Sequence, residues 1–153
     1  MHTVIFTGGK LRPGGLVDEV LDSADIIIAA DGGAAGALGL SIFPSVVIGD
    51  FDSLDEKSRR ILERKNTRFI THDTEKDRTD TELAVDYAVR SRATLITILG
   101  GFEGDRTDHV LANIFSATGH GVPVRFVSGL MEARILKGPE SWPESPSRPR
   151  LFA

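Results

Sequence analysis

Short apolar runs recur along the chain and are separated by segments that mix apolar and polar residues at helical spacing. The runs are rich in Val, Ile, Phe and Thr and predict β-strands at 3–7, 25–30, 45–49, 68–71, 93–99 and 122–127. Several lack the alternation of a strand with one solvated face, so we expect helices to cover both faces. The segments between the runs predict helices at 15–22, 33–39, 54–65, 80–91 and 107–118.

This alternation of strands and helices predicts an α/β fold. Because β–α–β units produce parallel strands, we expect a three-layer α/β/α arrangement around a mainly parallel, Rossmann-like sheet of about six strands. A last short run at 132–137 would add an edge strand. Two helix starts carry the capping-box pattern, in which Ser or Thr is followed three residues later by Glu: Ser53 with Glu56, and Thr79 with Glu82.

The C-terminal residues differ in composition from the rest. Four of the seven prolines lie between Gly138 and Pro149. Proline at this density blocks helices and interior strands. We therefore expect one domain over residues 1–137, followed by a Pro-rich linker or tail over 138–153.

Composition and charge narrow the class of protein. A chain of 153 residues with 41% hydrophobic and 26% charged residues fits one globular domain. A net charge of -4 argues against a general nucleic-acid or anionic-membrane binder, which needs a basic surface. The chain contains no cysteine, which excludes disulfides, thiolate catalysis and cysteine-ligated metals. No run is long enough to span a bilayer and no signal peptide opens the chain, so we expect a cytoplasmic protein.

Acidic residues gather where the predicted strands end. Asp31 follows the second strand, Asp50 and Asp52 follow the third, and further acids follow the fourth and fifth. Ligands of open parallel sheets bind beyond the carboxyl ends of the strands, so we expect these carboxylates to meet at one edge. Gathered carboxylates repel each other and persist only when a cation neutralises them. The sequence therefore predicts a cation site at this edge.

The residues around these acids predict a metal–polyphosphate site. Asp50 and Asp52 are two positions apart, so in extended backbone their side chains point to the same side. Such a pair suits a hard divalent ion, Mg²⁺ foremost, which usually also binds waters and substrate phosphates. Glycines at 32, 33, 100, 101 and 104 would let backbone N–H groups approach an anion, and Arg106 would supply a forked donor. Helix starts at Thr79 and near Thr107 add partial positive charge for a phosphate.

Some of these residues also have ordinary structural interpretations. Asp31 and Gly32 fit a tight turn, and Thr79 fits a helix cap, whatever else they do. His109 and Asn113 fit a hydrogen-bonding role on one helix face. The segment at 8–10 (GGK) lacks the G-x-x-x-x-G-K-[ST] spacing, which excludes a P-loop, and the missing G-x-G-x-x-G fingerprint argues against a dinucleotide dehydrogenase.

Four segments resemble the motifs of one known family. They are 30–34 (ADGGA), 49–53 (GDFDS), 77–84 (DRTDTELA) and 104–113 (GDRTDHVLAN), in the family's order. Through them the chain resembles the catalytic domain of thiamine pyrophosphokinase over about residues 3–136. The resemblance implies pyrophosphoryl transfer from ATP to thiamine, giving AMP and thiamine diphosphate, with Mg²⁺ required. It also implies a homodimer whose thiamine pocket lies between the subunits.

The resemblance further implies roles for individual residues, in three sets, and the catalytic set shares residues with each of the other two. The catalytic candidates are Asp52, Asp80 and Asp108. The candidates for binding ATP are Asp31, Gly32, Thr79, Arg106 and Asp108. The candidate metal ligands are Asp50, Asp52, Asp77 and Asp80. Which aspartate accepts the proton of the thiamine hydroxyl stays open.

The chain departs from the family pattern at two places. Asp105 stands where the family often has glycine, which adds charge beside the expected phosphate path. Family members also carry a C-terminal β-sandwich domain that helps to form the thiamine pocket, and residues 138–153 are too few to supply it. Three alternatives therefore stay open: a nucleotide-binding module without catalysis, a pyrophosphokinase for another alcohol such as a pterin, and a metal-dependent phosphohydrolase.

Overall fold

The computed structural model describes residues 1–71, 78–103 and 107–136. Its strands are β1 (His2–Phe6), β2 (Ile26–Ala30), β3 (Val46–Gly49), β4 (Arg68–Thr71), β5 (Leu95–Leu99), β6 (Val124–Ser128) and β7 (Met131–Ile135). Its helices are α1 (Gly15–Asp22), α2 (Gly33–Gly39), α3 (Glu56–Arg64), α4 (Asp80–Arg90) and α5 (Thr107–Thr118). The predicted α/β fold is confirmed, and the run near the end of the described chain does form an additional strand. None of the described helices is long and apolar enough to cross a bilayer.

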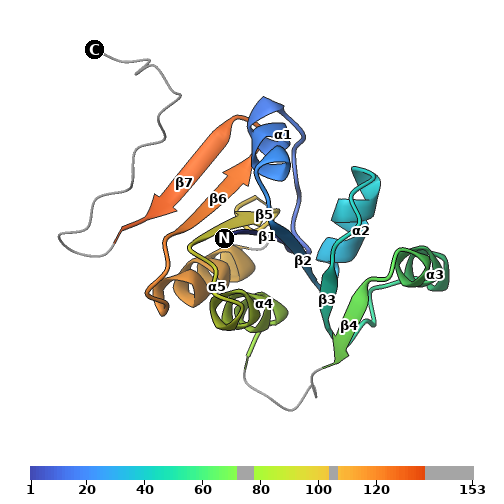
Figure 1. The fold of residues 1–153 in the computed structure, drawn as a ribbon. Coiled ribbons are helices and arrows are strands. Elements are labelled where there is room, and N and C mark those ends of the chain that lie inside the picture. The colour runs from blue at the N-terminus through green and yellow to red at the C-terminus, as the bar shows by residue number, and fades with distance from the viewer. Residues whose placement is uncertain (72–77, 104–106, 137–153) are drawn as a thin grey trace.

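One sheet contains all the described strands, in the order β4-β3-β2-β1-β5-β6-β7 (Figure 1). The first strand lies in the middle: Val4 is in register with Ile27 of β2 on one side and with Thr97 of β5 on the other. Strands β1 to β6 run parallel, and β7 returns antiparallel beside β6. The chain winds outward from β1 in both directions, so the switch point of the sheet lies where β1 and β5 end.

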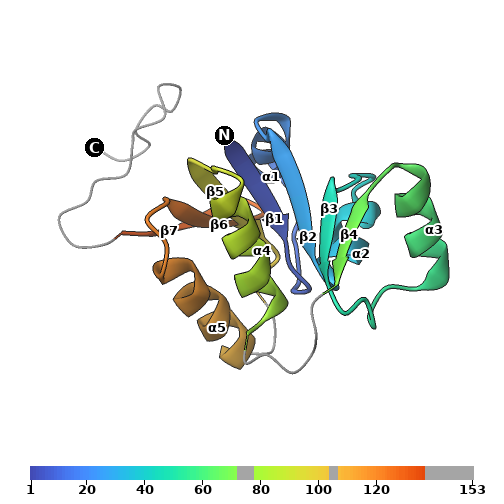
Figure 2. The same ribbon diagram turned by 60° about the horizontal axis from the view of Figure 1, so that its bottom comes forward.

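Helices cover both faces of the sheet (Figure 2). On one face, α1, α2 and α3 bury apolar side chains such as Val17, Ala34 and Leu62 against the strands. On the other face, α4 and α5 contribute buried residues that include Ala84 and Ala117. The expected three-layer arrangement follows from these two cores.

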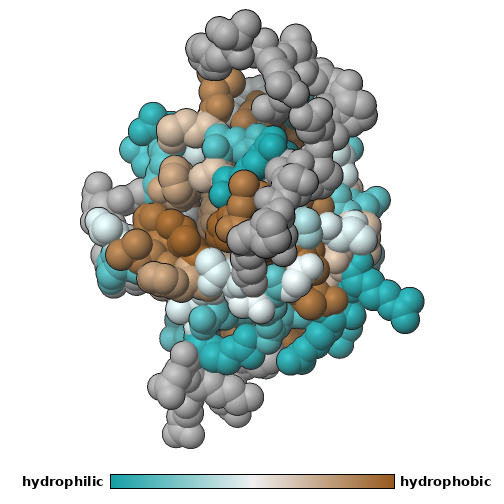
Figure 3. Space-filling view, turned by 90° about the vertical axis from the view of Figure 1, so that its left-hand side faces the viewer, coloured by the Kyte–Doolittle hydropathy of each residue, from teal (hydrophilic) through white to brown (hydrophobic). Residues whose placement is uncertain are grey.

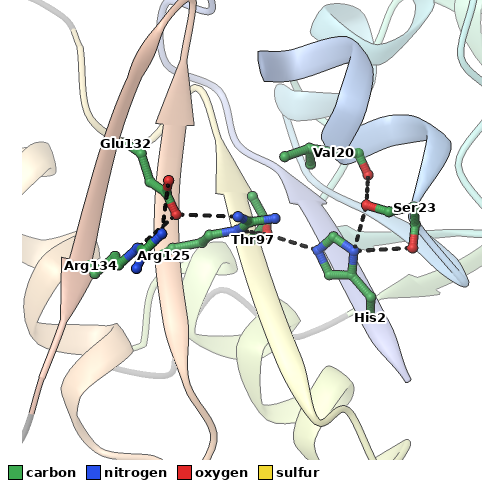
Figure 4. A network of polar contacts seen from close by, with 7 residues as sticks. All are labelled: His2, Val20, Ser23, Thr97, Arg125, Glu132 and Arg134. Carbon is green, nitrogen blue, oxygen red and sulfur yellow. Dashed lines mark hydrogen bonds and ion pairs between the residues drawn. The ribbon is translucent and has the colours of Figure 1, made fainter. Parts of the chain in front are cut away.

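A chain of polar contacts crosses the face that carries α1 (Figure 4). The Nδ1 atom of His2 lies 3.1 Å from the carbonyl oxygen of Ser23, and its Nε2 atom lies 2.8 Å from the hydroxyl of Thr97. The Nε atom of Arg125 donates to the same hydroxyl at 2.8 Å, which leaves the Thr97 O–H free to donate to His2. The neutral tautomer with its proton on Nδ1 satisfies all of these contacts. Burial accordingly lowers the pKa of His2, although the hydrogen bond to Ser23 opposes the shift.

The lowered pKa of His2 predicts a loss of stability in mild acid. Below the ordinary histidine pKa of about 6.5, the unfolded chain binds a proton more readily than the folded chain does. The free energy of unfolding should therefore fall as the pH drops from about 6.5 toward the lower folded pKa, by less than about 1 kcal/mol because solvent screens a half-exposed ring. Urea titrations between pH 7.5 and about 5.5 should show a steeper decline for the natural chain than for His2→Gln. Equal slopes would contradict a neutral folded His2.

Candidate functional site

The turn between β2 and α2 holds Asp31 in an unusual backbone conformation. Asp31 has a φ of 36°, in the left-handed region that aspartate tolerates better than most residues. Its N–H donates to the carbonyl of Ile48 at 2.8 Å, and its own carbonyl accepts from the N–H of Ala34 at 3.0 Å. The predicted tight turn is therefore confirmed, and it joins the end of β2 to the end of β3.

The carboxylate of Asp31 is only half satisfied by the described residues. Its Oδ2 atom accepts a hydrogen bond from the hydroxyl of Ser53 at 2.5 Å. Its Oδ1 atom is buried, and within the described chain it has no hydrogen-bond partner. A buried carboxylate oxygen without a donor is costly, so this atom marks a position where a cation or a ligand donor would be stabilised.

Two acids lie close to the backbone of Gly49, the last residue of β3. Its φ of 151° lies in a region that side chains rarely adopt. A Cβ built on it would lie 2.9 Å from Cβ of Asp31 and 3.3 Å from Oδ1 of Asp80. Asp31 and Asp80 therefore lie beside the point where the chain leaves β3 toward Asp50. The expected meeting of carboxylates at this edge is found for these residues.

The segment after Gly49 is not extended, as we had expected when placing Asp50 and Asp52 on one side. Phe51 has a φ of 66°, and its ring packs edge-on against Phe69, with 5.4 Å between the ring centres. The N–H of Asp52 then donates to Oδ1 of Asp50 at 3.1 Å. Asp50 is half-buried and Asp52 is exposed, so a tight turn, not a strand, presents both acids.

The predicted capping box at Ser53 is wrong. Helix α3 begins at Glu56, and its cap is Asp55, whose carboxylate accepts from the N–H of Ser58 at 2.9 Å. The same contacts with Ser58 hold the pKa of Asp55 below its ordinary value. Because Asp55 caps the helix, the Ser53 hydroxyl is available to Asp31.

Helix α4 begins with the other predicted capping box, which is confirmed. The hydroxyl of Thr79 accepts from the N–H of Glu82 at 3.2 Å, and the Glu82 carboxylate accepts from the N–H of Thr79 at 2.8 Å. Asp80 is the first residue of the helix. The cap thus fixes where Asp80 sits relative to Gly49, and Thr79 itself is exposed.

Replacing Thr79 should show how much the cap of α4 contributes to stability. Thr79→Ala removes the acceptor at the cap and should lower the free energy of unfolding by about 1 kcal/mol. Thr79→Ser keeps the acceptor and should leave the stability nearly unchanged. Chemical denaturation of both variants measures the difference, and equal stability of the two would contradict the cap.

The other predicted site residues lie around the fifth strand or outside the described residues. Asp108 is exposed on the first turn of α5, which follows β5. Asn113 of the same helix donates from its amide to the carbonyl of Gly101 at 3.1 Å, so this side chain ties α5 to the loop after β5. Asp77 and Arg106 lie outside the described residues.

Sequence analysis missed the loop after β1, which lies at the switch point of the sheet. A Cβ on Gly9 would lie 1.8 Å from the carbonyl oxygen of Gly100, so the two loops touch through bare backbone. Arg12 joins them a second time, with Nε 2.6 Å from the Glu103 carboxylate. The paired glycines directly after an apolar run were the available signal, and they were set aside because the segment lacks the spacing of a P-loop.

The donors at this edge fit a magnesium ion that arrives with a polyphosphate. All of them are oxygen atoms, which Mg²⁺ prefers. Across the described ranges 1–71, 78–103 and 107–136, no three acidic or histidine side chains converge as a complete metal cage. Mg²⁺ usually takes one or two carboxylates and fills its remaining positions with water and phosphate, so a partial set suffices.

Comparison with known proteins identifies close relatives over most of this region. A family model described as "Thiamin pyrophosphokinase, catalytic domain" matches residues 17–122. The chain is 38% identical over 93 residues to the thiamine pyrophosphokinase of Bacillus subtilis (strain 168), covering 61% of this chain and 43% of that protein.

Solved structures give the same result for the fold. A crystal structure of thiamine pyrophosphokinase from Bacillus subtilis matches with a TM-score of 0.67 and 29% identity, over 83% of this chain and 60% of that one. That of Geobacillus thermodenitrificans matches with a TM-score of 0.67 and 28% identity, over 83% and 59%. The chain thus spans less than two thirds of the length of these relatives.

Proposed function

The chain belongs to the thiamin pyrophosphokinase family, and on that premise we propose that it transfers the pyrophosphoryl group of ATP to the hydroxyl of thiamine, giving thiamine diphosphate and AMP. The observation that supports this most directly is the placement of Asp31 and Asp80 beside Gly49, at the carboxyl edge of the sheet. The matched range of residues 17–122 contains this whole edge from β2 to α5. The thiamine and ATP sites, like the pocket shared by two subunits that the resemblance implies, are part of the proposal.

The residues at the edge suit a reaction in which the protein mainly positions groups and balances charge. The hydroxyl oxygen of thiamine forms a bond to the β-phosphorus of ATP, the bond from that phosphorus to the α-phosphate oxygen breaks, and AMP leaves. Such transfers need in-line placement and neutralisation of phosphate charge, with little covalent help from the enzyme. A carboxylate at the edge accepts the proton that the hydroxyl loses.

We assign the metal to the acids that follow β3 and start α4. Asp50, Asp52 and Asp80, with Asp77, would hold Mg²⁺, and the orphaned Oδ1 of Asp31 lies within the same group. The bound ion would supply positive charge that offsets the charge of the phosphate oxygens. The residues of this chain bind and orient the nucleotide around it: the N-terminus of α4 at Thr79, and Asp108 with Arg106 near α5.

The test is nucleotide analysis after incubating the purified chain with Mg²⁺ and ATP, with and without thiamine. AMP that appears only with thiamine, matched by thiamine diphosphate, would support the proposal. AMP that forms with a pterin alcohol but not with thiamine would indicate that the acceptor is a pterin. Phosphate release without any acceptor would indicate a phosphohydrolase. ATP binding with no AMP under any condition would indicate a nucleotide-binding module.

A further inference from the structure

Exposed hydrophobic side chains are concentrated at one end of the sheet. Six large hydrophobic residues are exposed among the described residues, and five of them lie on α5, on the hairpin of β6 and β7 or directly after β7. These five, which we call the α5 patch, are Leu111, Phe115, Leu130, Met131 and Leu136. Figure 3, which views this end of the molecule, shows hydrophobic side chains gathered there. An apolar patch of this kind marks an interaction site more often than a free surface.

The patch lies beside the point where the chain leaves β7. Leu111 and Phe115 are four residues apart and share one face of α5. Phe115 is 70% exposed and lies in the last turn of the helix. Helix α5 also contacts β7, and Leu136 directly follows that strand. The residues after Leu136 therefore begin next to α5.

The residues after Leu136 carry one large aromatic side chain within reach of α5. Residues 137–153 lie outside the described residues and read KGPESWPESPSRPRLFA. Trp142, the only tryptophan of the chain, comes six positions after Leu136. Six residues in an extended, polyproline-like conformation span about 19 Å, whereas one turn of a helix rises about 5.4 Å. Trp142 can therefore reach both Leu111 and Phe115.

The composition of residues 137–153 favours a contact of this kind. The segment contains four prolines, each of which fixes its φ at about −65°. A segment whose backbone is already restricted loses less conformational entropy when it docks. Extended proline-rich segments bind aromatic-lined grooves in several classes of recognition domain for this reason. The restriction extends to Trp142, because Pro143 directly follows it.

We propose that the C-terminal segment, residues 137–153, folds back over α5 of the same chain and packs Trp142 against Leu111 and Phe115. The contact removes the indole ring and the Phe115 ring from water together, and aromatic pairs gain further from edge-to-face or offset stacking. The patch lies at the β7 end of the sheet, whereas Gly49 and the acids beside it lie where β3 ends. The contact is therefore independent of the proposed reaction, and its tests need no substrate.

The single tryptophan makes the contact measurable in the full chain. Trp142 dominates the intrinsic fluorescence, so quenching by acrylamide reports how far solutes reach that side chain. Because only the undocked fraction is open to the quencher, we expect quenching at least about threefold weaker in the folded chain than in the chain unfolded by urea. Equal quenching in the two states would overturn the proposal.

Substitutions on the domain test where Trp142 docks. Phe115→Ser should raise the quenching toward its value in urea, and Leu111→Ser, one helical turn away, should do the same as a separate variant. Phe43→Ser is the matched control, because Phe43 is 41% exposed but lies outside the patch, under the Nζ atom of Lys65. Circular dichroism of each variant checks that it is folded. Natural quenching in both folded patch variants, or equal effects of Phe115→Ser and Phe43→Ser, would overturn the site.

The reciprocal test follows the patch instead of the tryptophan. Trp142→Ala should uncover Leu111 and Phe115, so this variant should bind the hydrophobic dye ANS more strongly than the natural chain does. Ser145→Ala, three residues further along the same segment, removes no apolar side chain and should leave dye binding unchanged. A Trp142→Ala chain that binds no more dye than the natural chain would contradict a covered patch.

Dilution separates a contact within one chain from a contact between two chains. Docking within a chain does not depend on protein concentration, whereas binding of a second copy does. The quenching of Trp142 should therefore stay constant as the natural chain is diluted. Shielding that is lost on dilution would show that a second copy covers Trp142, and it would overturn the proposed contact.

Discussion

Replacing Asp52 by asparagine is expected to lower thiamine-dependent AMP formation at least about a hundredfold while leaving the fold intact. Asp52 is exposed, and its backbone N–H, not its carboxylate, makes the hydrogen bond to Asp50. The substitution therefore removes a negative charge from the edge without removing a packing contact. The rate is measured by nucleotide analysis. Calorimetry measures how ATP binding depends on Mg²⁺, and we expect this dependence to be lost as well.

The control is the same substitution three residues further on. Asp55 is a fully exposed acid that caps α3, and asparagine caps a helix about as well as aspartate does. Asp55→Asn should therefore keep both the stability and the rate of the natural chain. A folded Asp52→Asn chain with the same rate and the same Mg²⁺ dependence would contradict the assignment of the metal to this turn.

Replacing Gly33 by alanine is expected to destabilise the fold by at least about 3 kcal/mol. A Cβ at this position would lie 2.1 Å from the carbonyl oxygen of Phe6 and 2.8 Å from the backbone nitrogen of Thr7. Both atoms belong to the central strand or its exit, which cannot move without disturbing the pairing with β2 and β5. Urea denaturation followed by circular dichroism measures the loss.

Gly36 provides a control within the same helix. The nearest atom to a Cβ built there is 3.9 Å away, an ordinary contact with the Phe6 ring. Gly36→Ala should stabilise the chain by about 0.5–1 kcal/mol, because alanine favours a helix over glycine. A lower free energy of unfolding with Gly33→Ala and a higher one with Gly36→Ala would establish that the close approach to β1 constrains Gly33. A Gly33→Ala chain as stable as the natural chain would contradict this constraint.

The position of the site could be predicted because it depends on patterns that are local in sequence. Every apolar run became a strand, since runs of Val and Ile that lack alternation suit a sheet covered on both faces. Parallel strands bring their carboxyl ends to one edge, so acids at successive strand exits had to lie near each other. The contacts of Asp31 and Asp80 with the position of Gly49 are the result.

The details that sequence analysis missed depend on partners far away in the chain. Phenylalanine rarely adopts a positive φ, and Phe51 does so where its ring packs on Phe69, 18 residues later in the chain. Ser53 and Asp55 both head a pattern that can cap a helix. In the structure Asp55 is the cap, and the Ser53 hydroxyl donates to Asp31, which lies 22 residues earlier in the chain. The tight contact of Gly9 with Gly100 follows from β1 lying next to β5, an order that no local pattern encodes.

The central place of β1 has a consequence for how the chain folds during its synthesis. Phe6 pairs with Leu99, so one side of the middle strand stays open until the ribosome has made most of the domain. At about 5–20 residues per second, this interval lasts roughly 5–20 s. Throughout it Val4, Ile5 and Phe6, all buried in the finished fold, lack the neighbouring strand on their β5 side, although β2 and the helices already made can cover the rest. We therefore expect the newly made protein to be most prone to aggregation just before β5 emerges, and codons that slow translation ahead of residue 95 would prolong that exposure.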